Sequence, residues 1–178
     1  TLIDLKSVID FMQGKKSTRI KGLVFDNPNS STVRYMNELS GIDGLPKEGV
    51  YSFKTNQEVI RFVAQNDGMI GVVGIDWLFQ PPLEMQAIVD KTTILSVKAT
   101  NKNEYIFPSQ DNLAQGKYPL ARDLYIINCQ GYSGLGMGFA SFLSGERGQR
   151  IVLKSGLVPV RYPSRKIKVR NTISKDKN

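Results

Sequence analysis

The feature that most limits the fold of this 178-residue chain is a short apolar segment followed at once by turn-forming and helix-capping residues. Residues 20–25 form the apolar segment, which is a predicted strand, and residues 26–32 form the polar stretch. Val33 and Met36 then lie three residues apart, which is typical of a helix, and Ser40-Gly41 predicts its end. A strand that leads directly into a helix is the repeating unit of α/β proteins, so we expect this fold class.

The rest of the chain continues the alternation of strands and helices. Leu5, Val8 and Met12 form one apolar stripe of a helix that ends at Gly14, and Thr55 with Glu58 predicts a capping box at the start of another. The other predicted strands are residues 69–73, 88–100, 124–129 and 166–172, and the other predicted helices are residues 109–114, 136–143 and 145–154. Residues 124–129 are apolar, which favours a buried strand.

Composition excludes several classes of function. The chain has no histidine, which excludes a Ser-His-Asp triad and every zinc site that needs an imidazole. Its single cysteine, Cys129, excludes an internal disulfide, and its apolar neighbours predict a buried, unreactive thiol. We therefore expect no catalytic residue, no metal and no cofactor, and we do not expect an enzyme. No stretch approaches the ~20 apolar residues of a transmembrane helix.

The positive charge is concentrated near the C-terminal end of the sequence. Residues 160–178 hold seven basic residues and one acidic residue, and so carry six of the eight net positive charges. Tyr162 is the only aromatic residue in this segment, whereas nucleic-acid-binding surfaces usually combine basic and aromatic side chains. A solvated basic tail is the favoured interpretation, and nucleic-acid binding is an alternative.

The candidate ligand-binding residues lie where the first predicted strand meets its helix. Asn29, Ser30, Ser31 and Thr32 are polar residues at a predicted helix N-terminus. Such a terminus offers up to about four unpaired backbone N–H donors and about half a positive charge, which suits an anion with several oxygens. The alternative is that these residues only cap the helix. Arg34, in the first turn, would be favoured by a nearby anion.

Five segments in a fixed order resemble one protein family. They are residues 5–15, 30–32, 58–73, 118–126 and 138–159, of which the fourth reads Tyr-Pro-Leu-Ala-Arg-Asp-Leu-Tyr-Ile. In this order they resemble the substrate-binding proteins of phosphate ABC importers, which have the type II periplasmic binding protein (PBP) fold. In that family Ser30, Ser31 and Thr32 would take the place of a Ser-Gly-Thr loop that binds the anion.

The resemblance implies a three-layer α/β/α architecture with two lobes and a ligand cleft between them. Residues 1–121 would form the second lobe with the Ser/Thr loop, and residues 122–178 a crossover strand and the C-terminal part of the first lobe. The chain would be partial and would lack most of the first lobe. The implied partners are phosphate or another small oxyanion and an ABC permease. The implied location is the periplasm or the exterior of the cell envelope, where a lipid anchor is one form of attachment.

Two residues depart from the family pattern. Ser31 replaces a glycine, and Asp26 stands where the family has a phosphate-binding arginine. A like-charge contact at ~5 Å and an effective dielectric of ~20 costs roughly 3 kcal/mol. Asp26 must therefore point away, accept a proton from a protonated oxyanion, or indicate another ligand, and Arg34 is a candidate to replace the lost charge. A sensor or protein-interaction module of the same fold that has lost its ligand is the main alternative.

Overall fold

The structure is a computed structural model that describes residues 1–164, and these residues belong to two compact units. Unit 1 consists of residues 1–124 and 155–158, and unit 2 consists of residues 125–154 and the chain from residue 159. The strands of unit 1 are β1 (Leu2–Asp4), β2 (Gly22–Phe25), β3 (Val50–Ser52), β4 (Met69–Gly71), β5 (Ser96–Lys98) and β6 (Tyr105–Ile106). Its helices are α1 (Leu5–Met12), α2 (Ser31–Ser40), α3 (Asn56–Gln65), α4 (Asp76–Phe79), the 3-10 helix η1 (Leu83–Met85), α5 (Gln86–Val89) and α6 (Gln110–Ala114).

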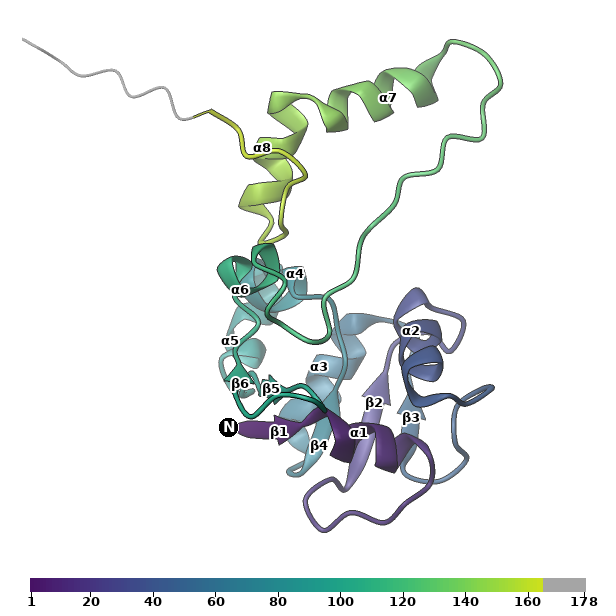
Figure 1. The fold of residues 1–178 in the computed structure, drawn as a ribbon, viewed down its shortest axis with the longest axis vertical. Helices are drawn as coiled ribbons and strands as arrows, with labels where there is room; N and C mark the ends of the chain where they lie inside the picture. The colour runs from purple at the N-terminus through teal and green to yellow at the C-terminus, as the bar shows by residue number, and fades with distance from the viewer. Residues whose placement is uncertain (165–178) are drawn as a thin grey trace, which may run out of the picture. The chain divides into compact units, whose positions relative to one another are not determined.

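The central sheet of unit 1 is parallel and has the order β3-β2-β4 (Figure 1). Leu23 and Phe25 of β2 pack in one cluster with residues of α1 and α2. Val24 points to the other face and is also fully buried, and α3 contacts β2 and β4. A strand that is buried on both faces is typical of a sheet covered by helices on both sides. The arrangement is therefore the expected α/β/α three-layer architecture.

A second sheet of unit 1 joins segments that are far apart in the sequence. Strand β5 pairs in parallel with β1 and antiparallel with β6. The Lys98 ammonium lies 2.6 Å from the Asp4 carboxylate, and the Tyr105 hydroxyl donates to the same oxygen at 3.2 Å. The hydrogen bond from Lys98 lowers the pKa of the Asp4 carboxyl below its usual 3.8. This ionised carboxylate therefore links all three strands.

The helix ends confirm the predicted capping signals. Helix α2 ends at Gly41, whose φ of 64° is the left-handed conformation that glycine adopts without strain. Thr55 and Glu58 form the predicted capping box, because the Thr55 side chain accepts from the Glu58 amide and the Glu58 carboxylate accepts from the Thr55 amide. Ser109 caps α6 in the same way by accepting from the amide of Asn112.

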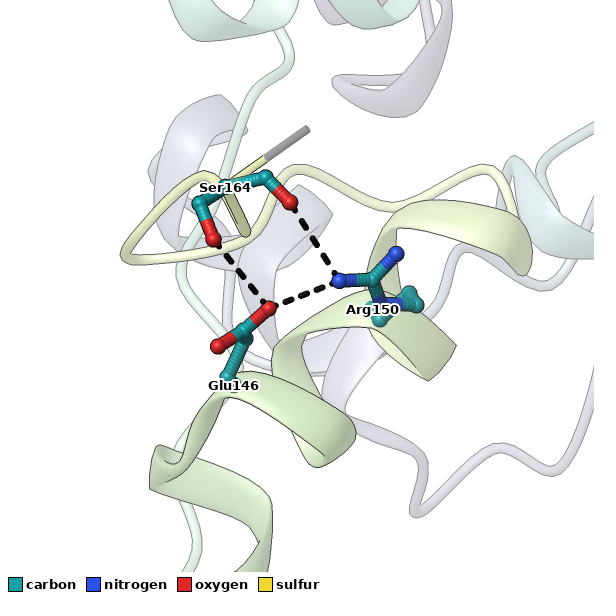
Figure 2. A network of polar contacts seen from close by, with 3 residues as sticks. All are labelled: Glu146, Arg150 and Ser164. Carbon is teal, nitrogen blue, oxygen red and sulfur yellow. Dashed lines mark hydrogen bonds and ion pairs between the residues drawn. The ribbon is translucent and has the colours of Figure 1, made fainter. Parts of the chain in front are cut away.

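Unit 2 contains helices α7 (Leu135–Ser144) and α8 (Glu146–Lys154), which contact each other. Hydrogen bonds connect α7, α8 and residues 161–164. Buried Gln149 donates to the Leu143 carbonyl at 2.8 Å and accepts from the Arg161 amide at 3.2 Å. Figure 2 shows a second network, in which Arg150 donates to the Glu146 carboxylate at 2.7 Å and to the Ser164 carbonyl at 3.3 Å. The Ser164 hydroxyl also donates to Glu146.

One predicted strand was wrong, and some short strands were not predicted. Residues 88–100 are not one strand, because Met85 and Val89 lie four residues apart and are both buried beside Ile60 of α3, which is a helical arrangement. Within residues 88–100 only β5 is a strand. Strands β1 and β3, of three residues each, were not predicted. The predicted strand 166–172 lies outside the described residues.

The segment 124–129 is exposed and is not a strand, which corrects the prediction of a buried strand. Leu124 and Ile127 expose 68% and 82% of their surface, and the Cys129 thiol is exposed as well. An apolar run becomes buried only where another layer covers it, and within residues 1–164 no strand pairs with this segment.

Candidate functional site

The start of helix α2 lies immediately after the central strand of the parallel sheet. Strand β2 ends at Phe25, and α2 begins at Ser31. The chain runs from β2 through α2 to β3 on one side of β2 and then crosses through α3 to β4 on the other side, so the strand order reverses at β2 (Figure 1). In open α/β sheets ligands bind beyond the carboxyl ends of the strands at such a reversal of strand order. The predicted Ser/Thr loop is therefore in the place where this architecture binds ligands.

Ser30 is the N-cap of α2. Its backbone is extended, with φ −70° and ψ 158°, and its hydroxyl oxygen accepts from the Val33 amide at 3.3 Å. The same hydroxyl donates to the Asp26 carboxylate at 2.6 Å. The Ser30 proton is thus used within the loop, and Asp26 orients the cap. The Asp26 carboxylate points toward the loop rather than away from it.

The amides of Ser31 and Thr32 are the donors that the helix itself leaves free. The first amides of a helix have no acceptor within it. Ser30 satisfies two of them, because its side chain accepts from Val33 and its carbonyl accepts from Arg34 at 3.1 Å. The amides of Ser31 and Thr32 remain without an intrahelical acceptor at the positive end of the helix dipole. Ser31 is also exposed, which leaves its hydroxyl accessible to solvent.

Arg122 reaches this helix from a segment that is distant in the sequence. Its guanidinium Nη2 donates to the Thr32 hydroxyl oxygen at 3.0 Å. Arg122 was not among the predicted site residues, although it is the arginine of the Tyr-Pro-Leu-Ala-Arg segment that supported the family resemblance. That segment was the only signal in the sequence that pointed to Arg122. A contact between residues 90 positions apart cannot be inferred from spacing along the chain. The structure brings Asp26, Ser30, Thr32 and Arg122 together.

The predicted site also includes Asn29 and Arg34. The Asn29 amide donates to the Asn27 side chain at 2.9 Å, an arrangement that forms the turn before the helix. The side chains of Asn29 and Arg34 belong to exposed residues. Asn29 is thus part of the loop that leads to the cap, and the structure places Arg122 rather than Arg34 against Thr32.

Tyr35 of α2 lies near Arg122, and Tyr118 lies near Tyr35. Burial raises the pKa of Tyr35, and the positive charge of Arg122 partly opposes that rise. Burial, with a smaller contribution from Tyr35, raises the pKa of Tyr118 to about 12. Both phenols are therefore neutral at physiological pH. They add no negative charge next to the guanidinium.

Other classes of site have no counterpart in the described part of the chain. Within residues 1–164, no three His, Cys, Asp or Glu side chains are grouped as metal ligands would be. None of the helices there has the length and apolar character needed to cross a bilayer. A cavity of about 520 Å³ is lined by residues of α7 and α8, and one of about 250 Å³ by Asp4, residues of α1 and residues 98–103. None of residues 26–34 lines either cavity. Most of the basic C-terminal segment lies outside the described residues.

One family model matches the sequence, and two solved structures share its fold. A family model described as the PBP superfamily domain matches residues 10–147. A solved structure of a provisionally assigned phosphate ABC transporter substrate-binding protein from Clostridium perfringens, with bound phosphate, aligns with a TM-score of 0.69 at 19% identity. A protein from Planctomyces limnophilus DSM 3776, provisionally assigned as phosphate-binding, aligns with a TM-score of 0.58 at 13% identity.

These alignments cover 89% and 90% of this chain. They cover only 63% and 60% of the two solved chains, so the present sequence spans less than two thirds of either. No curated protein matches the sequence.

Proposed function

Because the chain belongs to the PBP superfamily, we propose that it is the solute-binding component of an ABC importer and that it binds phosphate or a similar oxyanion at the start of α2. Binding, not catalysis, is the activity proposed. The two solved neighbours are both described as phosphate-binding, and one holds phosphate. By the same reasoning the proposed site of action is outside the cytoplasmic membrane, in the periplasm or at the envelope exterior, next to an ABC permease.

The contact between Arg122 and Thr32 is the observation that carries this proposal. It places a permanent positive charge 3.0 Å from the hydroxyl of a residue whose amide has no acceptor in the helix. Guanidinium groups bind oxyanions through paired N–H donors. The amides and hydroxyls of Ser31 and Thr32 would complete the set of donors, and Ser30 would hold the helix start in shape.

The positive charge of Arg122 would also offset the negative charge of Asp26, which by itself disfavours anion binding. A carboxylate alone would repel an anion, but here its Oδ1 already accepts the Ser30 proton at 2.6 Å. A guanidinium on the Thr32 side supplies an opposite charge of equal size. We propose that Arg122, rather than Arg34, replaces the arginine that the family has at position 26.

A titration of the 15N-labelled chain with phosphate and with sulfate, followed by NMR, tests the proposal. We expect phosphate to shift the amide signals of Ser31 and Thr32. A charge-assisted hydrogen bond contributes ~1.5–3 kcal/mol, so Arg122→Gln should weaken binding by roughly tenfold or more. The matched control is Arg61→Gln, which removes an exposed arginine of α3.

The outcomes separate the function from the assignment of its residues. If neither anion shifts the Ser31 and Thr32 signals at tens of millimolar, the proposed function is wrong for this site. If phosphate binds and Arg34→Gln weakens it more than Arg122→Gln does, the function stands and the role given to Arg122 is wrong. Asn29→Ala should have the smallest effect, because the Asn29 contact with Asn27 uses its backbone amide.

A sensor or protein-interaction module without a ligand is the second candidate. The Asp26–Ser30 hydrogen bond favours it, because this bond uses the proton that Ser30 could otherwise donate to an anion. Asp26→Asn discriminates between the two candidates, since it removes the negative charge at nearly constant shape. Tighter phosphate binding by this variant would support an ancestral site that Asp26 has disabled, and weaker binding would support a site that uses Asp26.

The division into lobes remains a proposal. We propose that residues 1–121 form the second lobe, which carries the Ser/Thr loop, and that residues 122–178 belong to the first lobe. The parallel sheet and α2 lie within the first of these segments.

Nuclease-protection or filter-binding assays at low salt would test the nucleic-acid alternative, whose affinity should fall steeply with salt.

A further inference from the structure

The two units of the chain differ in charge. Unit 1 contains 14 basic and 14 acidic residues, so it carries no net charge. Unit 2 contains ten basic and two acidic residues, and it therefore carries the whole net charge of +8. A region this basic attracts anionic partners, and the attraction weakens as the salt concentration rises. The charge alone does not distinguish a nucleic acid from a membrane of anionic lipids.

Helix α7 of unit 2 presents large apolar side chains to solvent. Leu135, Phe139 and Phe142 follow one another at spacings of four and three residues, so they share one face of the helix, which we call the α7 face. They expose 87%, 55% and 44% of their surface. The ten residues of α7 include no charged side chain. Exposed aromatic and aliphatic side chains on an uncharged helix suit the interface of a bilayer better than the phosphate backbone of a nucleic acid.

Helix α8 carries a row of basic side chains. Arg147, Arg150 and Lys154 follow one another at spacings of three and four residues, so they lie on one side of the helix, and all three are exposed. Arg150 pairs with the Glu146 carboxylate at 2.7 Å. Within residues 1–164, Arg147 and Lys154 form no ion pair. Their positive charges are therefore available to an anionic group outside the chain.

A cavity of about 520 Å³ connects the apolar face of α7 with the basic row of α8. The residues that line it come from both helices and the turn between them: Ser141, Phe142, Gly145, Glu146, Arg147 and Arg150. Glu146 is the one acidic residue of unit 2 within residues 1–164, and it is already paired with Arg150. A phospholipid needs this combination, because a guanidinium binds its phosphate and an aromatic ring contacts its acyl chains.

We propose that unit 2 binds the surface of an anionic phospholipid bilayer. The α7 face enters the boundary between the headgroups and the acyl chains, and Arg147 and Lys154 contact lipid phosphates. The remaining basic residues of unit 2 add a longer-range attraction to the same surface. This binding would keep the chain at the membrane, but it does not rest on anion binding at α2.

Cosedimentation of the 178-residue chain with lipid vesicles tests the proposal. Vesicles of equal parts phosphatidylglycerol and phosphatidylcholine supply the anionic surface, and vesicles of phosphatidylcholine alone are the uncharged comparison. At an ionic strength of ~0.1 M we expect the anionic vesicles to bind the chain at least tenfold more tightly. At ~1 M, where the Debye length is only ~3 Å, most of this difference should be lost.

Two variants with matched controls localise the contact. Phe139→Ser should weaken binding to anionic vesicles by roughly tenfold, whereas Leu83→Ser, at a 98% exposed leucine of unit 1, should leave it unchanged. Arg147→Gln should weaken it by roughly fivefold, whereas Arg61→Gln, at an exposed arginine of α3, should not. Circular dichroism checks the folding of each variant, and Leu135→Ser carries the test of the α7 face if Phe139→Ser does not fold.

Several results would overturn the proposal. One is a chain that does not bind anionic vesicles at low salt. Full affinity in either Phe139→Ser or Arg147→Gln is another, because the proposal requires both the apolar and the basic contact. A homodimer in analytical ultracentrifugation that Phe139→Ser dissociates, without vesicle binding, would make a second copy the occupant of the α7 face. Tighter binding to duplex DNA than to vesicles, unaffected by Phe139→Ser, would assign unit 2 to nucleic acid.

The vesicle assays also separate this proposal from the proposed function. Their buffers contain no phosphate, and none of the variants alters the start of α2. Vesicle binding can therefore succeed when the phosphate titration fails, and the reverse result is equally informative.

Discussion

Unit 1 buries a core of hydrophobic side chains, whereas unit 2 exposes many of its hydrophobic side chains. Every buried hydrophobic residue of the described core lies between Leu5 and Ile106, and all of these belong to unit 1. In unit 2 the buried polar residue Gln149 connects the parts, while aromatic residues such as Phe139 and Phe142 are exposed. Both units contain regular helices, so secondary structure alone does not explain the difference.

The difference shows that a sequence pattern can form a helix or strand without burying the apolar side chains of that element. Unit 1 has a sheet with helices on both faces, and this arrangement buries a hydrophobic core. Unit 2 has two contacting helices and an extended segment, which cover only one side of α7. The face of α7 that carries Phe139 and Phe142 is therefore left exposed. The stability of unit 2 should therefore depend on polar contacts far more than that of unit 1.

The sharpest test of this comparison replaces one phenylalanine in each unit. Phe25→Ala in β2 should lower the free energy of unfolding by ~3–5 kcal/mol, because it leaves a cavity at a fully buried position. Phe139→Ala, at a 55% exposed position of α7, should change it by less than ~0.5 kcal/mol. Urea denaturation followed by fluorescence measures both. Equal losses would show that unit 2 is as tightly packed as unit 1 and would break the comparison.

A smaller effect is expected for Gln149→Ala. Its side chain accepts from the Arg161 amide and donates to the Leu143 carbonyl, so the substitution leaves two backbone groups unsatisfied. A fully buried unsatisfied group costs ~1–3 kcal/mol, but Leu143 is only partly buried and Arg161 is exposed, so water can replace part of each bond and the loss should be smaller than for Phe25→Ala. Hydrogen exchange should rise in α7 and α8 and stay constant in β2. The exposed Gln115, at the end of α6 in unit 1, gives the matched control Gln115→Ala. Faster exchange in β2 would mean that the two units unfold together.

The smallest expected effect is a pH dependence that belongs to unit 1. The hydrogen bond from Lys98 lowers the pKa of Asp4 below 3.8 in the folded chain. A lowered pKa stabilises the fold above the unfolded-state value, and this stabilisation is lost as the pH falls through the folded-state pKa. Asp4→Asn should therefore make the melting temperature less sensitive to pH between about 4 and 2. An unchanged pH profile would show that the pair with Lys98 does not stabilise the β1–β5 contact.

The sequence predicted most elements whose signals are local. Leu5, Val8 and Met12 identified α1 by their spacing, and the Thr55–Glu58 pair identified the start of α3. Both signals act over a few residues, so no tertiary information was needed. The three-residue strands β1 and β3 were missed because short strands depend on pairing with distant segments, such as β5 for β1.

The site could be predicted only for residues that are close to one another in the sequence. Ser30 as a helix cap can be inferred from its position after an apolar strand, and the structure confirms the cap. Arg122 could not be placed beside Thr32, because the contact spans 90 positions and depends on the fold of the chain between them. The burial of residues 124–129 was predicted from their apolar character, which describes a preference for burial but does not supply the layer that provides it.

The exposed thiol of Cys129 has a practical consequence. Since it is the chain's single cysteine, a maleimide fluorophore would label one position without any engineered substitution. That label would report on the local environment two residues beyond Ile127. Purification would correspondingly call for a reducing agent, because an accessible sulfhydryl oxidises readily in air.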